Sequence, residues 1–527
     1  MKKFLLIPLV IILIAGLCLA GCKAEEVTTT PPTTTPPTTP GPVAGGILRC
    51  IEGAFPAVIG YPPEFRPTDS IHALPCIERL CEWDEEGNQI PVLAESWEGD
   101  PENLTITWHL REGVTFHDGT PWNAEACRWN FQQRLDTGTL PDGPFVESLE
   151  VVDEYTLRMH LTAFNWMMIE NYGWAMMISP TAFENAGATD EERIEWARSN
   201  SVGTGAFKVV EFQRDVVLKY ERNDNYWREG MPYLDGIECR LIPDPVTAAA
   251  MMEAGEADMW FDASAVQSII DLEEKGLKVN WGPGMFWTLL PNSSDPDSIF
   301  AIKEIREAIE YAIDRPAIAE MLGYGKYEPL HQMASSTWPG YVEGYDPRPY
   351  DPEKARQKLE EAGYAGGFTT TLLATEMARD AVAAIQAYLG EVGIIVEPDI
   401  ADFGRYFGAV FFAGWDDLVL TASGINPDAT DLFIHYGPNP MTFRTGNIYK
   451  SPEYLALCAE ALDPQYKDAF EAMDKIKEAI RQAGEDAMIV PLWRTVNVAV
   501  MQPYVHSDYF IIHGVIWTPY DDWMEAH

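Results

Sequence analysis

The beginning of the chain limits what the rest of it can form. Two lysines, Lys2 and Lys3, precede an apolar run over residues 4–20, and small residues then lead to Cys22. This order of charge, apolar core and small residues is typical of a bacterial export signal, and the run is short for a membrane-spanning helix. We therefore expect the folded part of the chain to lie outside the cell membrane.

The end of this signal, Leu19-Ala20-Gly21-Cys22, resembles a lipobox. The resemblance implies that residues 1–21 are removed as a lipoprotein signal peptide. Cys22 would then carry lipid and hold the protein on the outer face of the membrane. An uncleaved membrane anchor is the alternative, and it places the folded part on the same side of the membrane.

A tether follows the cysteine. Residues 28–42 are almost entirely threonine and proline, so they have no apolar side chains to bury and stay extended. We expect residues 22–44 to form the lipidated cysteine plus a Thr/Pro-rich tether. No later apolar stretch is long enough to span a bilayer.

Composition narrows the classes of function. About 480 residues remain after the tether, which predicts two or three domains. The net charge of −44 argues against nucleic acid or an anionic lipid surface as partner. Because the acidic residues are spread along the chain, they indicate a solvated surface, with a cationic ligand as the alternative.

Cysteine and histidine spacing indicates neither a metal site nor a cofactor. Cys76 and Cys81 are separated by four residues, and the nine histidines are dispersed. Six cysteines remain in the mature part beyond Cys22, and they are predicted as buried thiols or disulfides with equal weight: Cys50, Cys76, Cys81, Cys127, Cys239 and Cys458.

Alternation of apolar and polar residues predicts strands in the first half of the chain. A half-buried strand is expected at 104–111, followed by hairpins over 149–161 and 206–220. Helical spacing dominates the second half, with stripes over 302–313 and 351–362 and a helix over 375–389 that leads into a strand at 394–396. This mixture predicts an α/β or α+β multidomain protein.

Capping residues mark where helices begin. Asp297 or Ser298 is expected to cap the helix over 302–313, and Asn123 the helix after Pro121. Asp351-Pro352 is a cap followed by proline in the first helical turn. Gly203 and Gly205 are expected to free the backbone where the chain re-enters a sheet.

Three ordered blocks carry a resemblance to a known family. The first comprises PVLAESW at 91–97 and LTITWHLREGVTFHDGTPWNAE at 104–125. The second comprises GTGAFK at 203–208, NDNYW at 223–227, PYLD at 232–235 and GEAD at 255–258. The third is IREAIEYAIDR at 305–315. In this order the chain resembles the extracellular solute-binding proteins of family 5, the peptide/nickel-type substrate-binding lipoproteins of ABC transporters, from about residue 45 to residue 523.

The resemblance implies an α/β, two-lobed periplasmic-binding-protein type II fold with an extra inserted subdomain (cluster C-like) and the ligand enclosed between the lobes. The implied division is lobe I over 45–75, 203–284 and 492–527, the inserted subdomain over 76–202, and lobe II over 285–491. The two crossings between lobes would lie near residues 285–290 and 490–493. Clefts between domains are where ligands usually bind.

Candidate ligand-binding residues lie near the crossings and in the segment 414–428, which corresponds to the family's principal ligand-reading stretch. Peptide-binding members have a tryptophan and an amine-pairing aspartate there, where this chain has Ser423 and Asn426. Asp428 is the alternative amine anchor, because an amide gives no charge-assisted bond to an ammonium group. Aromatic walls and carboxylate-binding forks complete the set of candidates: Phe286, Trp287, Trp415, Trp493, Arg405 and Arg494.

These features predict a monomeric, lipid-anchored receptor that closes around a peptide or similar organic solute and delivers it to ABC permease subunits. It would be extracytoplasmic, or periplasmic where an outer membrane exists. A binding protein for a non-peptide solute or a metal chelate is the alternative. A secreted glycan hydrolase is less favoured, because no pair of acids stands out and the sequence has no catalytic serine, zinc or phosphate-loop motif. No catalytic residue is predicted, and the pair His117-Asp118 is expected to shape a turn.

Overall fold

The computed structural model describes residues 41–65, 67–84, 88–261, 265–423, 431–437, 446–508 and 517–526. Residues 42–527 group into one compact unit by their contacts. Expectations for the signal peptide, Cys22 and most of the tether fall outside the described residues. Among the helices that the structure describes, none is both long enough and apolar enough to cross a bilayer.

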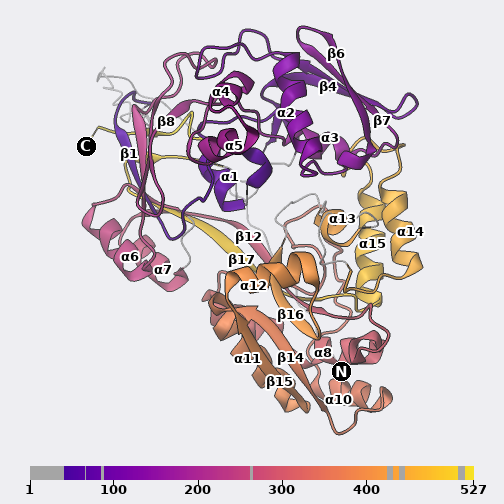
Figure 1. The fold of residues 1–527 in the computed structure, drawn as a ribbon. Coiled ribbons are helices and arrows are strands. Elements are labelled where there is room, and N and C mark those ends of the chain that lie inside the picture. Colours follow the sequence, from indigo (N-terminus) through magenta and orange to yellow (C-terminus); the bar gives the residue numbers. More distant parts are fainter. Residues whose placement is uncertain are drawn as a thin grey trace, which may run out of the picture. The chain divides into compact units, whose positions relative to one another are not determined.

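A mixed sheet of eleven strands organises this unit (Figure 1). Its order is β15-β14-β16-β12-β17-β11-β1-β10-β9-β8, with β13 paired to β17. The strands are β1 (Ile47–Glu52), β8 (Phe207–Gln213), β9 (Val217–Arg222), β10 (Gly236–Leu241), β11 (Met259–Trp260), β12 (Lys278–Pro291), β13 (Glu328–Pro329), β14 (Phe368–Thr375), β15 (Ile394–Ala401), β16 (Leu418–Ser423) and β17 (Val490–Met501).

Two long strands, β12 and β17, lie in the middle of this sheet and join its two ends. One end of β17 pairs with β11, while its other end pairs with β13. The register of the β12–β17 pair shifts between Pro283 and Phe286. At Gly284 an added Cβ would lie 2.6 Å from the Thr495 backbone, and the Thr495 hydroxyl accepts from the Met285 amide at 3.0 Å. Glycine is therefore required at this irregularity.

We call β11, β1, β10, β9 and β8 the first half of the sheet, and β16, β14 and β15 the second half. Helices supply apolar cores for both halves. They are α1 (Pro67–Ala73), α6 (Pro245–Ala254), α7 (Val266–Glu274), α8 (Lys303–Ala312), α9 (Arg315–Gly323), α10 (Pro352–Glu361), α11 (Arg379–Glu391), α12 (Phe403–Gly408), α13 (Asp431–Tyr436), α14 (Pro452–Ala461) and α15 (Met473–Glu485). Short helical turns are η1 (Pro62–Glu64), η3 (Ile299–Ala301), η4 (Glu376–Ala378) and the π-helical turn η5 (Ala409–Ala413).

A separate antiparallel sheet lies between β1 and β8 in the sequence. Its order is β4-β5-β7-β6, and its own core contains Trp108, Trp122 and Phe131. Its elements are β4 (Ala94–Asp100), β5 (Thr105–Leu110), α2 (Ala124–Asp136), η2 (Gly143–Phe145), β6 (Val146–Asp153), β7 (Thr156–Leu161), α3 (Met167–Gly173), α4 (Pro180–Asn185) and α5 (Asp190–Ser199), with the small hairpin β2 (Cys81–Trp83) and β3 (Gln89–Pro91). The last short pair is β18 (Val505–His506) with β19 (Trp523–Met524).

The strands predicted from alternation are confirmed as β5, the β6–β7 hairpin and the β8–β9 hairpin. The predicted helices are confirmed as α8, α10 and α11, although α11 begins later than expected because β14 continues to Thr375. The strand predicted at 394–396 is longer, reaching Ala401.

Several predicted caps are also present. Asn123 Oδ1 accepts from the Ala126 amide at 3.0 Å, and Asp351 Oδ1 accepts from the Lys354 amide at 2.9 Å. The expected cap of α8 is wrong. Ser298 caps the preceding turn η3 through the Phe300 amide, and α8 begins after Ile302 without a side-chain cap. Apolar spacing located the helix but did not resolve the extra turn before it.

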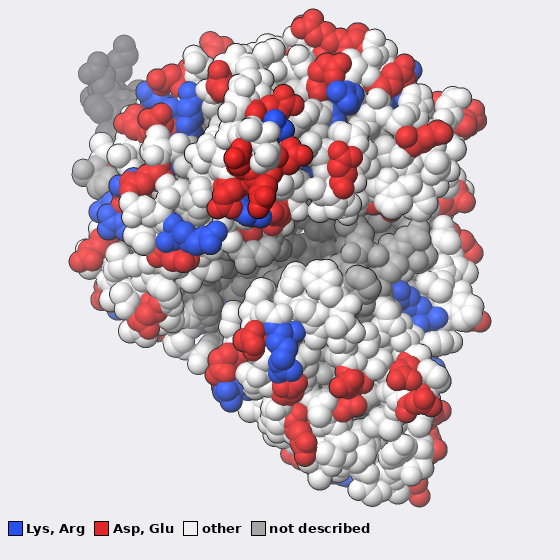
Figure 2. Space-filling view, viewed as in Figure 1, with Lys and Arg blue, Asp and Glu red and all other residues white. Residues whose placement is uncertain are grey.

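The charged surface agrees with the composition. Figure 2 shows acidic side chains scattered over the visible face, with fewer basic side chains among them. Many basic groups sit in short-range ion pairs, such as Arg198 with Glu64 at 2.8 Å and Lys475 with Glu460 at 2.8 Å. The acidic residues of this face are thus dispersed on the solvated surface.

Candidate functional site

Four side chains form one transverse row across the paired strands β16, β12, β17 and β13. Phe286 on β12 is the register partner of Ser423 on β16 and of Arg494 on β17. Arg494 is in turn the partner of Glu328 on β13. We call Ser423, Phe286, Arg494 and Glu328 the crossing row. Three of its four members were candidates from the sequence.

Arg494 is the charged centre of this row. Only 7% of the residue is exposed. Its guanidinium donates to Ser335 Oγ and to Thr337 Oγ1, the latter at 3.1 Å, and lies 3.5 Å from the Glu328 carboxylate. Burial lowers the pKa of this guanidinium, and the charge of Glu328 opposes the shift. Arg494 is therefore held by a carboxylate and two hydroxyls rather than by one ion pair.

Aromatic rings cover the same face. The rings of Phe286 and Trp338 are 4.7 Å apart, and the Arg494 guanidinium lies 5.4 Å from the Trp338 ring centroid. Phe286 and Trp338 both belong to the apolar cluster beneath α13, α14 and α15. The arrangement combines a flat apolar surface with a buried cation, which suits an organic molecule with a polar end.

Trp287 and Trp493 occupy the next row and face the other way. Their rings stack 5.9 Å apart with an interplanar angle of 18°, and they pack with the core of α8, α9 and α11. Successive residues of a strand point to opposite faces, so these two tryptophans do not share a surface with Phe286 and Arg494. The pairing of β12 with β17 thus brings the predicted aromatic residues close together, but on opposite faces of the sheet.

The remaining candidates lie apart from the crossing row. Trp415 is buried beside Asn447, whose Nδ2 donates to the Trp415 carbonyl at 2.8 Å. Arg405 is exposed on α12 and pairs with Asp399, to which its Nη1 donates at 2.9 Å. Asn426 and Asp428 lie outside the described residues.

Sequence reasoning missed Glu328, Ser335, Thr337 and Trp338. These residues come from β13 and the loop after it, about 160 positions before Arg494. No local pattern in that loop distinguishes them from ordinary surface residues.

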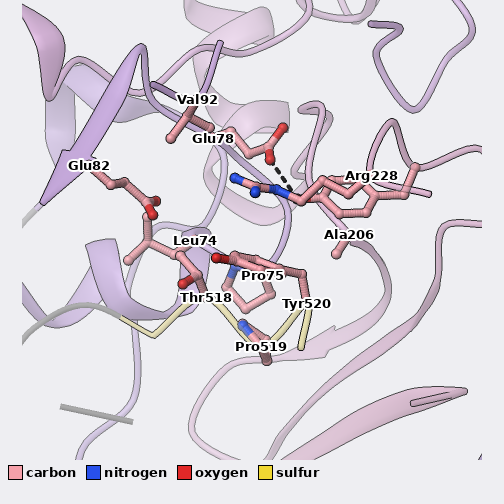
Figure 3. Close-up of a pocket in the computed structure, with 11 residues that line it drawn as sticks. Leu74, Pro75, Glu78, Glu82, Val92, Ala206, Arg228, Thr518, Pro519 and Tyr520 are labelled. Atoms are coloured by element: carbon pink, nitrogen blue, oxygen red, sulfur yellow. Dashed lines mark hydrogen bonds between the residues drawn. The ribbon is translucent and has the colours of Figure 1, made fainter. Parts of the chain in front are cut away.

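A second polar site lies beside the first half of the sheet, at the start of the inserted region (Figure 3). Glu78 accepts from Thr204 Oγ1 at 2.7 Å, Tyr226 OH at 2.8 Å and Trp227 Nε1 at 2.9 Å. Burial raises the pKa of Glu78 to about 7 against these hydrogen bonds. The Arg228 guanidinium lies on the Trp227 and Tyr520 rings, at 4.4 and 4.5 Å from their centroids. The residues of this small pocket therefore connect the C-terminal segment, residues 518–520, to the first half of the sheet.

The turn at His117-Asp118 and the glycines at 203 and 205 have structural roles. His117 Nε2 is 2.9 Å from the Gly205 carbonyl oxygen, and Asp118 accepts from Ser179 Oγ at 2.6 Å. Burial lowers the pKa of His117 to about 4. A Cβ at Gly203 would lie 2.2 Å from the Cys76 carbonyl oxygen, so the chain passes there only as glycine. This agrees with the expected turn at His117-Asp118.

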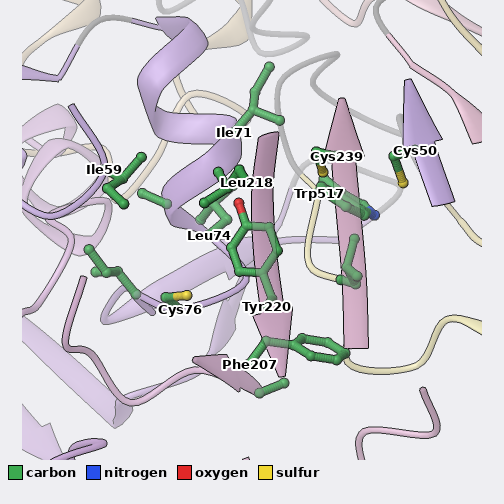
Figure 4. Close-up of a cluster of buried hydrophobic side chains, with 14 of the residues drawn as sticks. Cys50, Ile59, Ile71, Leu74, Cys76, Phe207, Leu218, Tyr220, Cys239 and Trp517 are labelled. Atoms are coloured by element: carbon green, nitrogen blue, oxygen red, sulfur yellow. The ribbon is translucent and has the colours of Figure 1, made fainter. Parts of the chain in front are cut away.

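The cysteines are buried thiols. All six described cysteines are free, and Figure 4 shows Cys50, Cys76 and Cys239 among the apolar side chains of the first half. Cys50 and Cys239 are register partners on β1 and β10. Within the described ranges, no group of three or more His, Cys, Asp or Glu side chains is arranged to hold a metal ion.

Comparison with known proteins agrees with this fold. The model of the bacterial extracellular solute-binding proteins, family 5 (Middle), matches residues 88–439. The glutathione-binding protein GsiB of Shigella flexneri is 30% identical over 355 residues, which cover 63% of this chain and 67% of that protein.

Two solved structures resemble the whole described unit. DppA from Helicobacter pylori, in complex with the peptide STSA, has a TM-score of 0.80 at 22% identity and covers 92% of this chain and 99% of its own. AgaA from Agrobacterium tumefaciens R10, in complex with agropinic acid, has a TM-score of 0.78 at 22% identity with the same coverage of both chains. The expected α/β, two-lobed periplasmic-binding-protein type II fold is thereby confirmed. This chain belongs to the bacterial extracellular solute-binding proteins of family 5.

Proposed function

We propose that this protein is a lipid-anchored extracytoplasmic receptor that captures an organic solute by closure of its lobes and delivers it to an ABC importer. Family membership supports solute binding. The lipobox-like sequence before Cys22 and the Thr/Pro-rich tether support anchoring on the outer face of the membrane. The DppA neighbour is an ABC transporter-associated binding protein, which supports permease subunits as the partner.

The crossing row is the observation that carries the proposal. It places a buried guanidinium and an aromatic ring on the strands that are common to both ends of the large sheet. Residues at such a junction change their surroundings when the two lobes rotate. We assign lobe I to 45–75, 203–284 and 492–527, its inserted subdomain to 76–202, and lobe II to 285–491.

The solute class that fits is a short peptide or a similar organic molecule. GsiB binds glutathione, and DppA was solved with a peptide, which favours a peptide-like solute. Asn426 stands where peptide-binding members of the family have the amine-pairing aspartate, and AgaA was solved with agropinic acid. These two facts support a non-peptide organic acid as the second candidate. In both cases the protein binds the solute as a monomer and leaves it chemically unchanged.

The test begins with the bound solute. Full-length protein is purified gently from the native membrane, and the small molecules that it releases on unfolding are identified by mass spectrometry. A reproducible solute that rebinds with unchanged mass, and that reduces the radius of gyration in solution scattering, supports the receptor. A released product of altered mass, or scattering unchanged at saturation, contradicts it.

Anchoring is tested separately with Cys22→Ser. The wild-type protein is expected to incorporate labelled fatty acid and to remain with the membrane fraction, whereas the variant incorporates none. The matched control is Cys458→Ser, which removes a buried thiol outside the signal sequence. Labelling of the Cys22→Ser variant would contradict the lipid assignment without affecting the solute-binding proposal.

A further inference from the structure

Two arginines lie together in the inserted region without a carboxylate partner. Arg79 precedes β2 and is 4% exposed, and its Nε and Nη1 have no hydrogen-bond partner among the described residues. Arg134 lies near the end of α2, and its buried Nε also lacks a partner there. Neither guanidinium forms an ion pair with any carboxylate that the structure describes. Buried donors without acceptors are rare in proteins and call for an explanation, such as a bound ion.

The two charges are close enough to act on each other. Burial lowers the pKa of both guanidinium groups to about 10, and the positive charge of Arg79 adds to the lowering at Arg134. Glu82 attracts Arg79 electrostatically, but this carboxylate also lines the pocket of Figure 3 and acts on Arg228. One shared carboxylate leaves an excess of positive charge around Arg79 and Arg134, which is costly in a buried site.

Neighbouring aromatic rings hold the Arg79 guanidinium in place without accepting hydrogen bonds from its N–H groups. The Arg79 guanidinium lies 4.3 Å from the centroid of the Trp174 ring, and the Trp83 ring is 3.8 Å from Trp174. A ring supports the face of a guanidinium and leaves its N–H edge free. Gln89 Nε2 is a further buried donor without a described partner. The site thus offers several N–H donors, which is the chemistry that binds oxyanions.

A buried arginine elsewhere in the protein has acceptors for its donors. Arg306 donates to the carbonyl oxygens of Phe300, Asp486 and Ala487 at 2.8 to 2.9 Å. Arg348 Nε also lacks a well-aligned hydrogen bond, but it lies 3.2 Å from the Glu310 carboxylate, whereas Arg79 and Arg134 have no such carboxylate among the described residues.

We propose that Arg79 and Arg134 form a binding site for an oxyanion, a carboxylate or a sulfate-like group, between α2, α3 and β2. Arg134 is partly exposed, so an anion can enter on its side. An oxyanion in bidentate contact with each guanidinium would accept hydrogen bonds from the N–H groups that have no partner. Its negative charge would also offset their positive charge.

Helix α3 connects this site to the second half of the molecule. Trp174 ends α3, while Trp166, directly before it, donates to the Ala461 carbonyl at 2.9 Å and contacts the Phe433 ring edge-on at 6.3 Å. Seven residues of helix span about 10 Å. This proximity favours the carboxylate of the captured solute over a free inorganic anion as the occupant. The oxyanion site stands without the proposed receptor function, and only the choice of occupant rests on it.

The first experiment uses sodium sulfate and the full-length protein. Calorimetric titration at constant ionic strength, with chloride as the balancing salt, is expected to show saturable sulfate binding. Arg134→Gln is expected to weaken it at least tenfold, while Arg379→Gln, which removes an exposed arginine paired with Glu376, leaves it unchanged. Arg79→Gln, checked for folding by circular dichroism, is expected to weaken it similarly. Absence of saturable binding, or equal binding by wild type and Arg134→Gln, overturns the proposal.

The second arm distinguishes the two sources of the anion. Glutathione, which carries two carboxylates, is titrated into wild type with and without saturating sulfate. Competition, together with at least tenfold weaker glutathione binding by Arg134→Gln, assigns the site to the solute. If sulfate binds without affecting glutathione, or if glutathione does not bind, the site is assigned to a free anion. Failure of the receptor function would instead appear as a released product of altered mass or as scattering unchanged at saturation.

Discussion

Buried arginines are held differently in two regions of this protein. Around α8 and α9, Arg315 donates to the Pro491 carbonyl at 2.7 Å and to the Arg348 carbonyl at 3.1 Å, and it pairs with Glu310 at 3.3 Å. In the inserted region, Arg79 and Arg134 have no carboxylate partner among the described residues. The difference teaches that burial alone does not reveal the role of a charge. The acceptors around it distinguish a structural cation from one that awaits a ligand.

The largest expected effect is in the satisfied region. Arg315→Met removes the donors of several buried carbonyls and leaves Glu310 with less positive charge nearby. We expect a loss of about 3–5 kcal/mol in the free energy of unfolding, measured by urea denaturation. Arg405→Met is the control and is expected to leave the urea midpoint unchanged, because Arg405 is exposed. Equal losses in both variants would remove the distinction between the two regions.

The next effect concerns pH and the buried carboxylate of the first half. The folded-state pKa of Glu78 is raised to about 7, above its unfolded value. Its contribution is therefore fully present below about pH 4.5 and is lost as the pH rises through 7, amounting to about 3 kcal/mol. Glu78→Gln is expected to flatten the fall of unfolding free energy between pH 5 and pH 8. An unchanged slope in the variant would show that Glu78 is already ionised in the folded protein.

A substitution of Arg494 is expected to have an intermediate effect on the free energy of unfolding, because one carboxylate and two hydroxyls hold its guanidinium. Arg494→Gln should lower the free energy of unfolding by about 1–3 kcal/mol, since Glu328 keeps its bonds from Ser335 and Ser336. It should also weaken binding of the released solute about tenfold, equivalent to about 1.4 kcal/mol. Thr337→Val, which removes one acceptor, is the matched control. Unaltered solute binding in Arg494→Gln would limit the crossing row to a structural role.

The smallest effect on stability is expected at the unsatisfied pair. Arg134→Gln should change the free energy of unfolding by less than about 1 kcal/mol in chloride, with stabilisation as the favoured sign, because it removes repulsion from Arg79. In sulfate the wild type should gain stability while the variant does not. Thermal unfolding in the two salts measures this. A large loss in chloride would mean that Arg134 is structural, like Arg315.

Local sequence patterns were sufficient to predict many individual helices and strands. Alternation over 104–111 fixes which face of a strand is buried, and Asp351 with Pro352 marks a helix start by chemistry within four residues. The crossing row depends instead on pairing between β13 and β17, whose partners are about 160 residues apart. The sequence around Glu328 therefore gave no sign of the role of this residue. The same holds for Arg79 and Arg134, which are 55 positions apart in the sequence and act on each other only in the folded chain.

The stacked pair Trp287 and Trp493 gives this protein a built-in optical signal. The two indoles lie on neighbouring strands, directly beside the second register shift of this pair, between Trp287 and Thr288. Electronic coupling between two indole rings depends on their separation and mutual angle. The near-ultraviolet circular dichroism of the unlabelled protein should therefore record any twist between β12 and β17, and Trp493→Phe should abolish that component. Solute capture can then be followed in real time without attaching a dye.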